Sequence, residues 1–324
     1  MDKYFRFVHE DPNVRKNSSS GGAFTLISDY FLENCGIVYG CILDNDLNAV
    51  HVRGESPALR NQMRTSKYIQ SEQKEMFSQV ENDLLNERNV LYTGTPCQIQ
   101  SILSYLNLRG VSINRLTTID VMCHGVGSKR FFRDYLEYLE KKYKSKAVSV
   151  NFRTKRYKGQ KECIEVCFEN GEKFYSSSAK YDWFYSAYMK NYILRPSCYK
   201  CPFATTNRIS DITIADHWGY MDDEAYSLII CNTKKGEKIL DNYSQKLNQI
   251  NVDEIHQPHM HHPCSIPVKY DEFWKIYNSN GYLEVQKWMG NNTISGKIKD
   301  NLTRLIFKLH IAWFAKKISK KISL

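Results

Sequence analysis

The sequence has no run of about 18 uncharged apolar residues, so we expect no membrane-spanning helix. Its first residues, Met1 to Arg6, lack the apolar core of a secretion signal, which favours a cytoplasmic protein. Proteins in that compartment keep their thiols reduced. The ten cysteines are therefore expected to be free or to bind a metal, and not to pair as disulfides.

Internal repeats and low-complexity linkers are also lacking, and a content of 42% hydrophobic and 25% charged residues is typical of a globular protein. The net charge of +10 is uneven, because residues 297–321 hold eight Lys or Arg and one Asp, which gives +7 and leaves +3 for the rest. A nucleic-acid partner is therefore not expected. We predict one domain over residues 1–292, with a soft internal boundary near residue 145, and a basic tail over 293–324.

In the first half, apolar spacing predicts alternating strands and helices. The expected strands are 36–43, 49–53, 89–92 and 116–122, and the expected helices are 23–33, 72–86, 98–106 and 129–142. A strand–helix–strand order is typical of parallel β-α-β units. The first half is therefore expected to form a parallel sheet.

The second half has a different pattern, with alternating residues that favour antiparallel strands. The expected strands are 147–152, 162–168, 172–175, 211–215 and 227–232, and the expected helices are 181–192, 235–247 and a basic amphipathic helix at 294–322. The fold class is thus predicted to be α/β. Its mixed sheet would have a parallel first half and an antiparallel-rich second half, followed by the C-terminal amphipathic helix.

Four cysteines lie in predicted turns. Cys97 and Cys123 each follow a strand of the predicted parallel sheet, so both are expected at its carboxyl edge, where open α/β sheets bind ligands. Adjacent strands lie about 4.8 Å apart, which would bring these two thiols within reach of one metal centre. Cys198 and Cys201 form a C-x-x-C loop that would fold over the same edge. Four thiolates are the usual ligands of a four-iron cluster or a structural zinc ion.

Spacing alone leaves alternatives open. A C-x-x-C is also found as half of a zinc site or as a redox pair, and a cysteine in a turn is often buried and inert. A segment from His256 to Cys264 holds four histidines and one cysteine, which allows a divalent-metal site. A surface loop with incidental histidines is the preferred interpretation there, because the segment itself holds no acidic residue to orient the rings.

A polar turn, Ser18-Ser19-Ser20-Gly21-Gly22, precedes the first predicted helix. Hydroxyls and free N–H groups at a helix N-terminus bind phosphate, although a serine cap with flexible glycines explains the pattern more simply. No Gly-Lys-Ser/Thr follows, so the turn is not a Walker motif. Ser66-Lys67-Tyr68 is a second candidate phosphate contact, or else a solvated helix start.

Seven motifs occur in an order that is found in one known family. They are Arg15 with Ser18 to Phe24, Ser66 to Gln70, Gly94 to Gln98, Cys123 to Gly125, Phe152-Arg153, Cys198 to Pro202 and Ser210 to Gly219. From about residue 13 to residue 275, the chain resembles the beta-subunit family of coenzyme F420 hydrogenase and dehydrogenase. The seven motifs together are specific, although no single one of them is.

The resemblance implies an iron–sulfur flavoprotein, because family members that oxidise or reduce F420 carry FAD and a four-iron cluster. Carried over to this sequence, the cluster ligands would be Cys97, Cys123, Cys198 and Cys201. The flavin, FAD or FMN, would lie near the following residues: Ser19, Ser20, Gly21, Gly22, Lys67, Thr93, Gly94, Thr95, His124 and Arg153. Arg195 is a further candidate for an anionic group.

The chain also departs from the family pattern. Many relatives carry an N-terminal ferredoxin-like module, and no such module is present in this sequence, so we expect a ferredoxin-like carrier or a partner subunit to exchange electrons with the chain. A glycine that is common before the Ser-Lys-Tyr motif is Thr65 here. Short relatives of this form occur among bacterial surface-polysaccharide genes.

Two classes of function follow. The first is an oxidoreductase that passes electrons between a reduced cofactor, F420-like or other, and an external carrier or substrate of polysaccharide synthesis. The second is a zinc-stabilised or cofactor-less accessory protein of polysaccharide assembly. In either class, the basic helix at 294–322 would bind an anionic membrane at its inner face or dock on the body of the chain.

Overall fold

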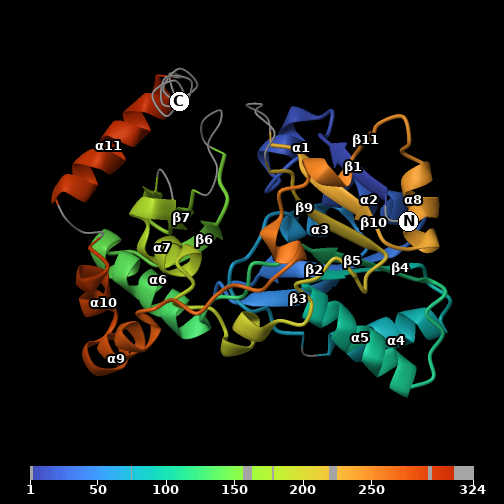
Figure 1. The fold of residues 1–324 in the computed structure, drawn as a ribbon, viewed down its shortest axis with the longest axis horizontal. Coiled ribbons are helices and arrows are strands. Elements are labelled where there is room, and N and C mark those ends of the chain that lie inside the picture. Colours follow the sequence, from blue (N-terminus) through green and yellow to red (C-terminus); the bar gives the residue numbers. More distant parts are fainter. Residues whose placement is uncertain are drawn as a thin grey trace.

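Two β-sheets organise the chain in the computed structural model (Figure 1). The structure describes residues 3–73, 75–155, 163–176, 179–218, 225–290 and 294–309. The larger sheet has eight strands in the order β11-β1-β10-β9-β5-β4-β2-β3, and the smaller has three in the order β6-β7-β8. In Figure 1 the larger sheet lies at the right and the smaller one at the left.

The centre of the larger sheet is parallel. Its parallel strands are β2 (Ile37–Leu43), β4 (Val90–Gly94), β5 (Leu116–Val121) and β9 (Ile212–Asp216). Antiparallel strands complete both edges, and they are β1 (Lys3–Phe7), β3 (Ala49–Gly54), β10 (Ser227–Cys231) and β11 (Asn248–Ile250). The parallel strands all end at the same edge, and this edge positions the candidate site.

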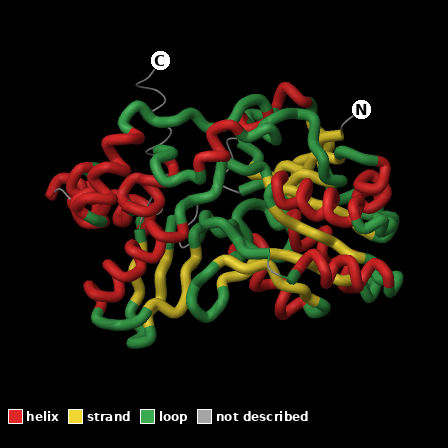
Figure 2. Tube along the Cα trace, turned by 90° about the horizontal axis from the view of Figure 1, so that it is seen from below, coloured by secondary structure: helices red, strands yellow, loops and turns green. Residues whose placement is uncertain are grey.

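Helices cover both faces of the larger sheet (Figure 2). One face packs on α2 (Ala23–Glu33), α3 (Pro57–Met63) and α8 (Lys234–Asp241), and the other on α4 (Met76–Leu85) and α5 (Pro96–Leu108). Side chains alternate between these faces, as strand geometry requires. Val90 and Tyr92 belong to the core with α4 and α5, whereas Leu91 belongs to the core with α2.

The smaller sheet is antiparallel and packs with a group of helices around an aromatic core. Its strands are β6 (Ala147–Asn151), β7 (Glu165–Phe168) and β8 (Lys173–Tyr175), and its helices are α6 (Lys129–Tyr143), α7 (Trp183–Met189), α9 (Tyr270–Asn280) and α10 (Tyr282–Trp288). Phe132 lies 5.0 Å from Phe184 and 5.3 Å from Phe152 between ring centroids. Such edge-to-face and tilted pairs add to the stability that aromatic burial supplies.

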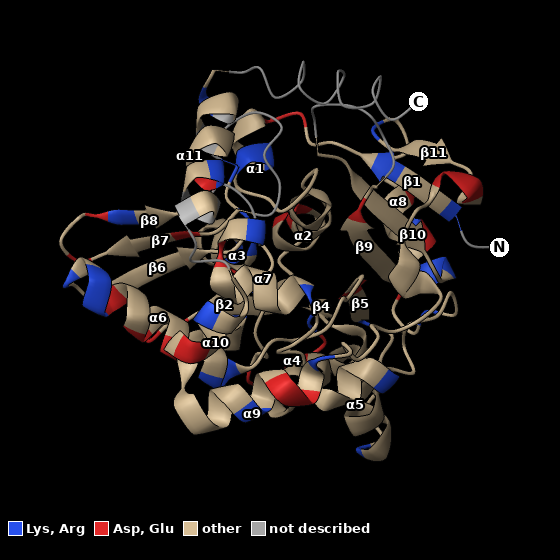
Figure 3. Cartoon of the chain, turned by 60° about the vertical axis from the view of Figure 1, so that its left-hand side comes forward, with Lys and Arg blue, Asp and Glu red and all other residues tan. Residues whose placement is uncertain are grey.

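Short helices and the C-terminal helix complete the described structure. They are α1 (Pro12–Lys16), η1 (Ala179–Tyr181), η2 (Pro196–Lys200), η3 (Val252–Glu254), η4 (Pro258–Met260) and α11 (Ile294–Lys308). Basic and acidic residues lie side by side on outer helices such as α6 and α8 (Figure 3). Among the described helices, none has the length and apolar content to span a membrane.

The predicted α/β class with a mixed sheet is confirmed, and so are the parallel first half and the antiparallel strands of the second. Some helix boundaries were wrong. Glu72 and Gln73 are not helical, since Glu72 bridges to Val50 of β3. Helix α7 ends at Met189 instead of residue 192, and α8 ends at Asp241 instead of residue 247. The Asn242 side chain ends α8 by donating to the Lys238 and Ile239 carbonyls.

Two other predictions, the full length of the tail helix and the domain boundaries, are not tested by the described residues. The tail helix appears as α11 up to Lys308, and its predicted continuation to residue 322 lies outside the described residues. The domain boundaries at 145 and 292 stay predictions. Strands β1 and β11, and helices α1, α3, α9 and α10, had no counterpart in the sequence-based assignment.

Candidate functional site

A cavity of about 300 Å³ opens at the carboxyl edge of the parallel strands. Thr93 and Gly94 at the end of β4, Val121 at the end of β5 and Asp216 at the end of β9 all line it. Arg153, which follows β6, and Tyr185, Tyr188 and Met189 of α7 also line it. A cleft at this edge is the usual ligand position in open α/β folds, and its volume suits a small ligand.

The serine–glycine turn forms one end of the cavity, and its glycines are required by the backbone. A Cβ on Gly21 would lie 2.2 Å from the Phe7 carbonyl oxygen, and Gly22 has a φ of +97°. Gly22 is the N-cap of α2, so the N-terminus of this 11-residue helix opens at the cavity. A helix N-terminus presents N–H groups and a partial positive charge to an anion.

The serine hydroxyls of this turn already bind other parts of the chain. Ser20 Oγ lies 2.8 Å from Ser227 Oγ, and Ser19 Oγ accepts from the backbone N–H of Ser66 at 2.9 Å. The Ser19 bond holds the two segments that were predicted as phosphate contacts against each other, and the Ser20 bond joins the turn to β10. Ser19, Ser20 and Gly22 line the cavity, whereas Gly21 makes the close backbone approach behind it.

Two basic residues from the sequence-based site also line the cavity. The Lys67 ammonium donates to the carbonyls of Arg64 at 2.7 Å and Gln62 at 3.0 Å, and burial lowers its pKa to about 8. Arg153 is paired with Asp216, with Nη1 and Oδ2 2.6 Å apart. Part of the cationic charge in the cavity is therefore balanced within the protein before any ligand binds.

One cavity residue has a buried ring nitrogen that no described group satisfies. His51 is 5% exposed, and its Nε2 lies 3.0 Å from the Thr93 carbonyl oxygen. That carbonyl fixes the proton on Nε2, because burial lowers the pKa of His51 to about 4 and keeps the ring neutral. Among the described residues, Nδ1 has no hydrogen-bond partner, so it is an acceptor for a donor group in the cavity.

Cys97 lies at the start of α5, where its position is set by a capping box. The Gln98 side chain accepts from the backbone N–H of Thr95 at 3.0 Å, and Pro96 is the first helical residue. The Cys97 thiol is exposed and lies 3.2 Å from Thr95 Oγ1. Cys97 thus lies at the positive end of the α5 dipole, at the carboxyl edge of the sheet.

The four cysteines of the predicted cluster act on one another electrostatically. Burial raises the pKa of the Cys123 thiol, and negative charges on Cys198, Cys97 and Cys201 raise it further. Burial likewise raises the pKa of Cys198, with Cys201 and Cys97 adding to the effect. The structure thus brings these thiols from three segments near each other, whereas the identity of any bound group stays a prediction.

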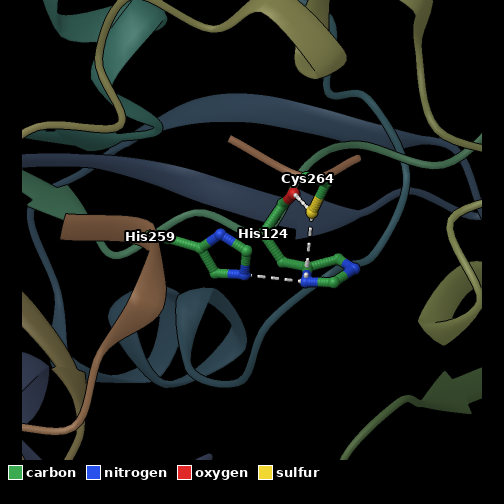
Figure 4. A group of neighbouring side chains, drawn as sticks. All are labelled: His124, His259 and Cys264. Atoms are coloured by element: carbon green, nitrogen blue, oxygen red, sulfur yellow. Dashed lines mark hydrogen bonds between the residues drawn. The ribbon is translucent and has the colours of Figure 1, made fainter. Parts of the chain in front are cut away.

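A second group of sulfur and nitrogen donors lies beside Cys123 and was missed in the sequence. His124, His259 and Cys264 lie with one donor atom of each within 4.8 Å of the others (Figure 4). The segment from His256 to Cys264 was noted, but nothing in its spacing indicates that His124 joins it. His124 and His259 also line the cavity.

Other side chains of the cavity were not assigned to the site from sequence. They are Arg64, Tyr185, Tyr188 and Trp218, with Trp218 41% exposed. Tyr68 also lines the cavity, and its position in the Ser-Lys-Tyr motif was the one available signal. Arg195 caps η2 at an exposed position and does not line the cavity.

Comparison with known proteins shows a match to a family model and similarity to solved structures. The family model for the carboxyl terminus of the coenzyme F420 hydrogenase/dehydrogenase beta subunit matches residues 87–257, which is more than half of the chain. A chain of the xenon-derivatised F420-reducing NiFe hydrogenase complex from Methanosarcina barkeri is similar in fold, with a TM-score of 0.52. Its sequence is 17% identical, over 88% of this chain and 89% of that one. No curated protein matches the sequence.

Proposed function

Because the chain belongs to the coenzyme F420 hydrogenase/dehydrogenase beta-subunit family, we propose that it is an iron–sulfur flavoprotein that transfers electrons. Its substrate would be a reduced cofactor, F420-like or other, and its partner an external carrier. The observation that carries this proposal is the association of four thiols from three segments beside a ligand-sized cavity. Those are the two sites that electron transfer between a flavin and a cluster requires.

The donor set of the four cysteines fits a four-iron cluster. Each is a free cysteine. Burial and, to a smaller extent, charges on neighbouring members of the set raise the pKa of Cys123 and Cys198, and a bound cation would offset this effect. Soft thiolates favour iron–sulfur clusters and zinc over harder metal ions. We assign Cys97, Cys123, Cys198 and Cys201 as the ligands of one four-iron cluster, which would accept electrons singly.

The cavity fits a flavin nucleotide, FAD or FMN. The N-terminus of α2, with Ser19, Ser20 and Gly22, would hold its phosphate, and Lys67 would supply a positive charge. The unpaired Nδ1 of His51 would accept a hydrogen bond from the bound molecule. A flavin supplies the exchange between a hydride and single electrons, and the cavity residues would orient it and exclude water.

Other sequence-predicted residues have supporting roles in this assignment. Thr93, Gly94 and Thr95 form the turn between β4 and α5, and would set the distance between the flavin and Cys97. Arg153 would bind an anionic group by exchanging part of its contact with Asp216. His124 lies directly after a proposed cluster ligand and faces the cavity, so it would contact either cofactor.

We propose that a ferredoxin-like carrier or a partner subunit docks at the Cys97 side. Cys97 is exposed, whereas Cys123, Cys198 and Cys201 are half-buried, so a cluster held by this set would be nearest the surface there. Electron exchange with a separate protein requires such a short path. The similarity to a chain of a hydrogenase complex supports a partner subunit as the docking protein.

Anoxic purification tests the proposal directly. We expect about four iron atoms and one flavin per chain, with visible absorption that dithionite bleaches. Cys97→Ser should lower the iron content, whereas Cys35→Ser, at an exposed cysteine outside the set, should leave it unchanged. A colourless protein without iron or flavin would overturn the proposal. Zinc held by the four cysteines would favour the alternative, a zinc-stabilised accessory protein of polysaccharide assembly.

We further propose that the protein works in the cytoplasm, in surface-polysaccharide synthesis, and that its tail binds the inner face of an anionic membrane. Three apolar side chains of α11, Ile298, Leu302 and Leu305, are about half exposed, and lie three or four residues apart on one helix face. The charge of +7 over residues 297–321 complements anionic lipid.

A further inference from the structure

Three donor side chains lie together beside the cavity, and of these only His124 has a place in the proposed electron transfer. They are His124, after β5, and His259 and Cys264, in the segment that follows η3. We propose that these three residues bind one divalent metal ion of the zinc class, in a site separate from the four-cysteine set. Two of the three lie beyond the region 87–257 that the family model matches.

The distances between the donor atoms suit a single small ion. His124 Nδ1 lies 3.0 Å from His259 Nε2 and 3.5 Å from Cys264 Sγ, and all three atoms lie within 4.8 Å of one another (Figure 4). With zinc bonds of about 2.0 Å to nitrogen and 2.3 Å to sulfur, tetrahedral ligand atoms lie about 3.3–3.7 Å apart. Small shifts of the rings would therefore suffice to admit the ion.

The other ring nitrogen of each histidine is buried, and neither His124 Nε2 nor His259 Nδ1 has a hydrogen-bond partner among the described residues. The nitrogens that approach each other are His124 Nδ1 and His259 Nε2. These two atoms would therefore offer their lone pairs to a metal ion.

The thiol of Cys264 is placed to become the third ligand. Cys264 is 6% exposed, and its thiol donates to the His124 carbonyl oxygen at 2.9 Å. Metal binding would form a metal–sulfur bond and release the thiol proton to solvent.

A fourth coordination position would face the cavity. His124 and His259 line the cavity, and Cys264 lies behind them. Three protein ligands with one open position are typical of zinc sites that bind water or a small ligand, whereas structural sites have four protein ligands. The inferred ion would thus bind an oxygen or nitrogen atom of the molecule in the cavity.

Metal analysis of the full-length protein tests the inference. After growth or dialysis with Zn²⁺, we expect about one zinc per chain that is independent of the iron content. His259→Ala and Cys264→Ala should each lower Zn²⁺ affinity at least about tenfold. The matched control is His261→Ala, because His261 is exposed and lies in the same segment. This control should keep the zinc.

Cobalt separates this site from the four cysteines. The Co²⁺-loaded protein should show a thiolate-to-cobalt charge-transfer band that is lost in Cys264→Ala and kept in Cys97→Ser. Cys97→Ser should lose iron and keep zinc, so failure of the cluster and failure of this site are distinguishable. If Cys264→Ala does not fold, His259→Gln gives the same comparison with a side chain close to the original in size.

Three results would overturn the inference. The first is a wild-type protein that retains no zinc or cobalt beyond the amount held by the four cysteines. The second is a His259→Ala variant with the same zinc content and affinity as His261→Ala. The third is loss of iron in place of zinc from Cys264→Ala, which would assign Cys264 to the cluster.

Discussion

At the scale of single residues, burial changes the acidity of one carboxyl far from the site. Asp182 begins α7 and is 1% exposed. It accepts hydrogen bonds from the backbone N–H of Tyr185 at 2.7 Å and the hydroxyl of Tyr135 at 2.8 Å. Both bonds favour the ionised form, but burial outweighs them and raises the pKa of Asp182 to about 6.

This shift predicts a pH dependence of folding stability. Protonated Asp182 contributes fully to the free energy of unfolding below about pH 4, and this contribution is lost as the pH rises through about 6. The loss amounts to about 2–3 kcal/mol. Asp182→Asn has nearly the same shape and no such titration. The free energy of unfolding of the wild type minus that of the variant, measured with urea, should therefore fall by about 2 kcal/mol between about pH 4.5 and about pH 7.

The control for this measurement is Asp46→Asn, which removes a carboxyl at an exposed position. Its unfolding free energy should differ from that of the wild type by nearly the same amount at both pH values. The raised pKa of Asp182 would be contradicted if the difference in unfolding free energy between the wild type and Asp182→Asn stayed constant or grew with pH.

At the scale of elements, the end of α6 is under backbone strain. Lys144 is the C-cap of this helix and has a φ of +51° and a ψ of +37°, in the left-handed region that glycine adopts without penalty. Lys144→Gly should therefore raise the unfolding free energy by about 0.5–1 kcal/mol. Lys141→Gly, inside the same helix and also exposed, should lower it by about 1 kcal/mol. Denaturant titration of both variants measures the contrast, and equal effects would refute it.

Elements with strong periodicity could be predicted from sequence, and weak ones could not. The helix at 23–33 was assigned with the bounds that α2 has, because its apolar residues repeat at helical spacing. Strand β11 has three residues and β1 has five, so neither gives a pattern long enough to detect. The end of α8 depends on a side-chain cap by Asn242, which apolar spacing does not register.

The same distinction applies to the site. Cys97 and Cys123 could be placed at the sheet edge because each directly follows a predicted strand, and β4 and β5 are indeed adjacent. The contact of His124 with His259 spans 135 residues, and that with Cys264 spans 140. Both contacts depend on where the segment after η3 lies in the fold. Local sequence does not encode that position. His51 had no sequence signal either, because its role comes from burial.

At the scale of the whole molecule, the cavity joins the two sheets. Strand ends of the larger sheet supply one wall, and Arg153, Tyr185 and Tyr188 supply the other. A ligand there would contact both parts, and binding energy would oppose their separation. The four cysteines follow the same arrangement, since Cys97 and Cys123 follow strands of the larger sheet and Cys198 and Cys201 come from the loop after α7.

The C-terminal helix leaves several of its apolar side chains exposed. Ile298, Leu302 and Leu305 are 54%, 52% and 50% exposed, and α11 contacts η1. A chain that ends at residue 292 should therefore unfold at nearly the same denaturant concentration as the full chain. If the tail binds anionic lipid, this shorter chain should lose sedimentation with phosphatidylserine vesicles.

The lipid charge supplies the control. The full chain should sediment with phosphatidylserine vesicles and much less with phosphatidylcholine vesicles, and added salt should release it, because each Lys or Arg near an anionic surface contributes about 1 kcal/mol that salt screens. Equal sedimentation of the full and shortened chains would show that the tail does not bind the membrane. If the shortened chain unfolded at a markedly lower denaturant concentration, the tail helix would instead be a part that docks on the body of the protein.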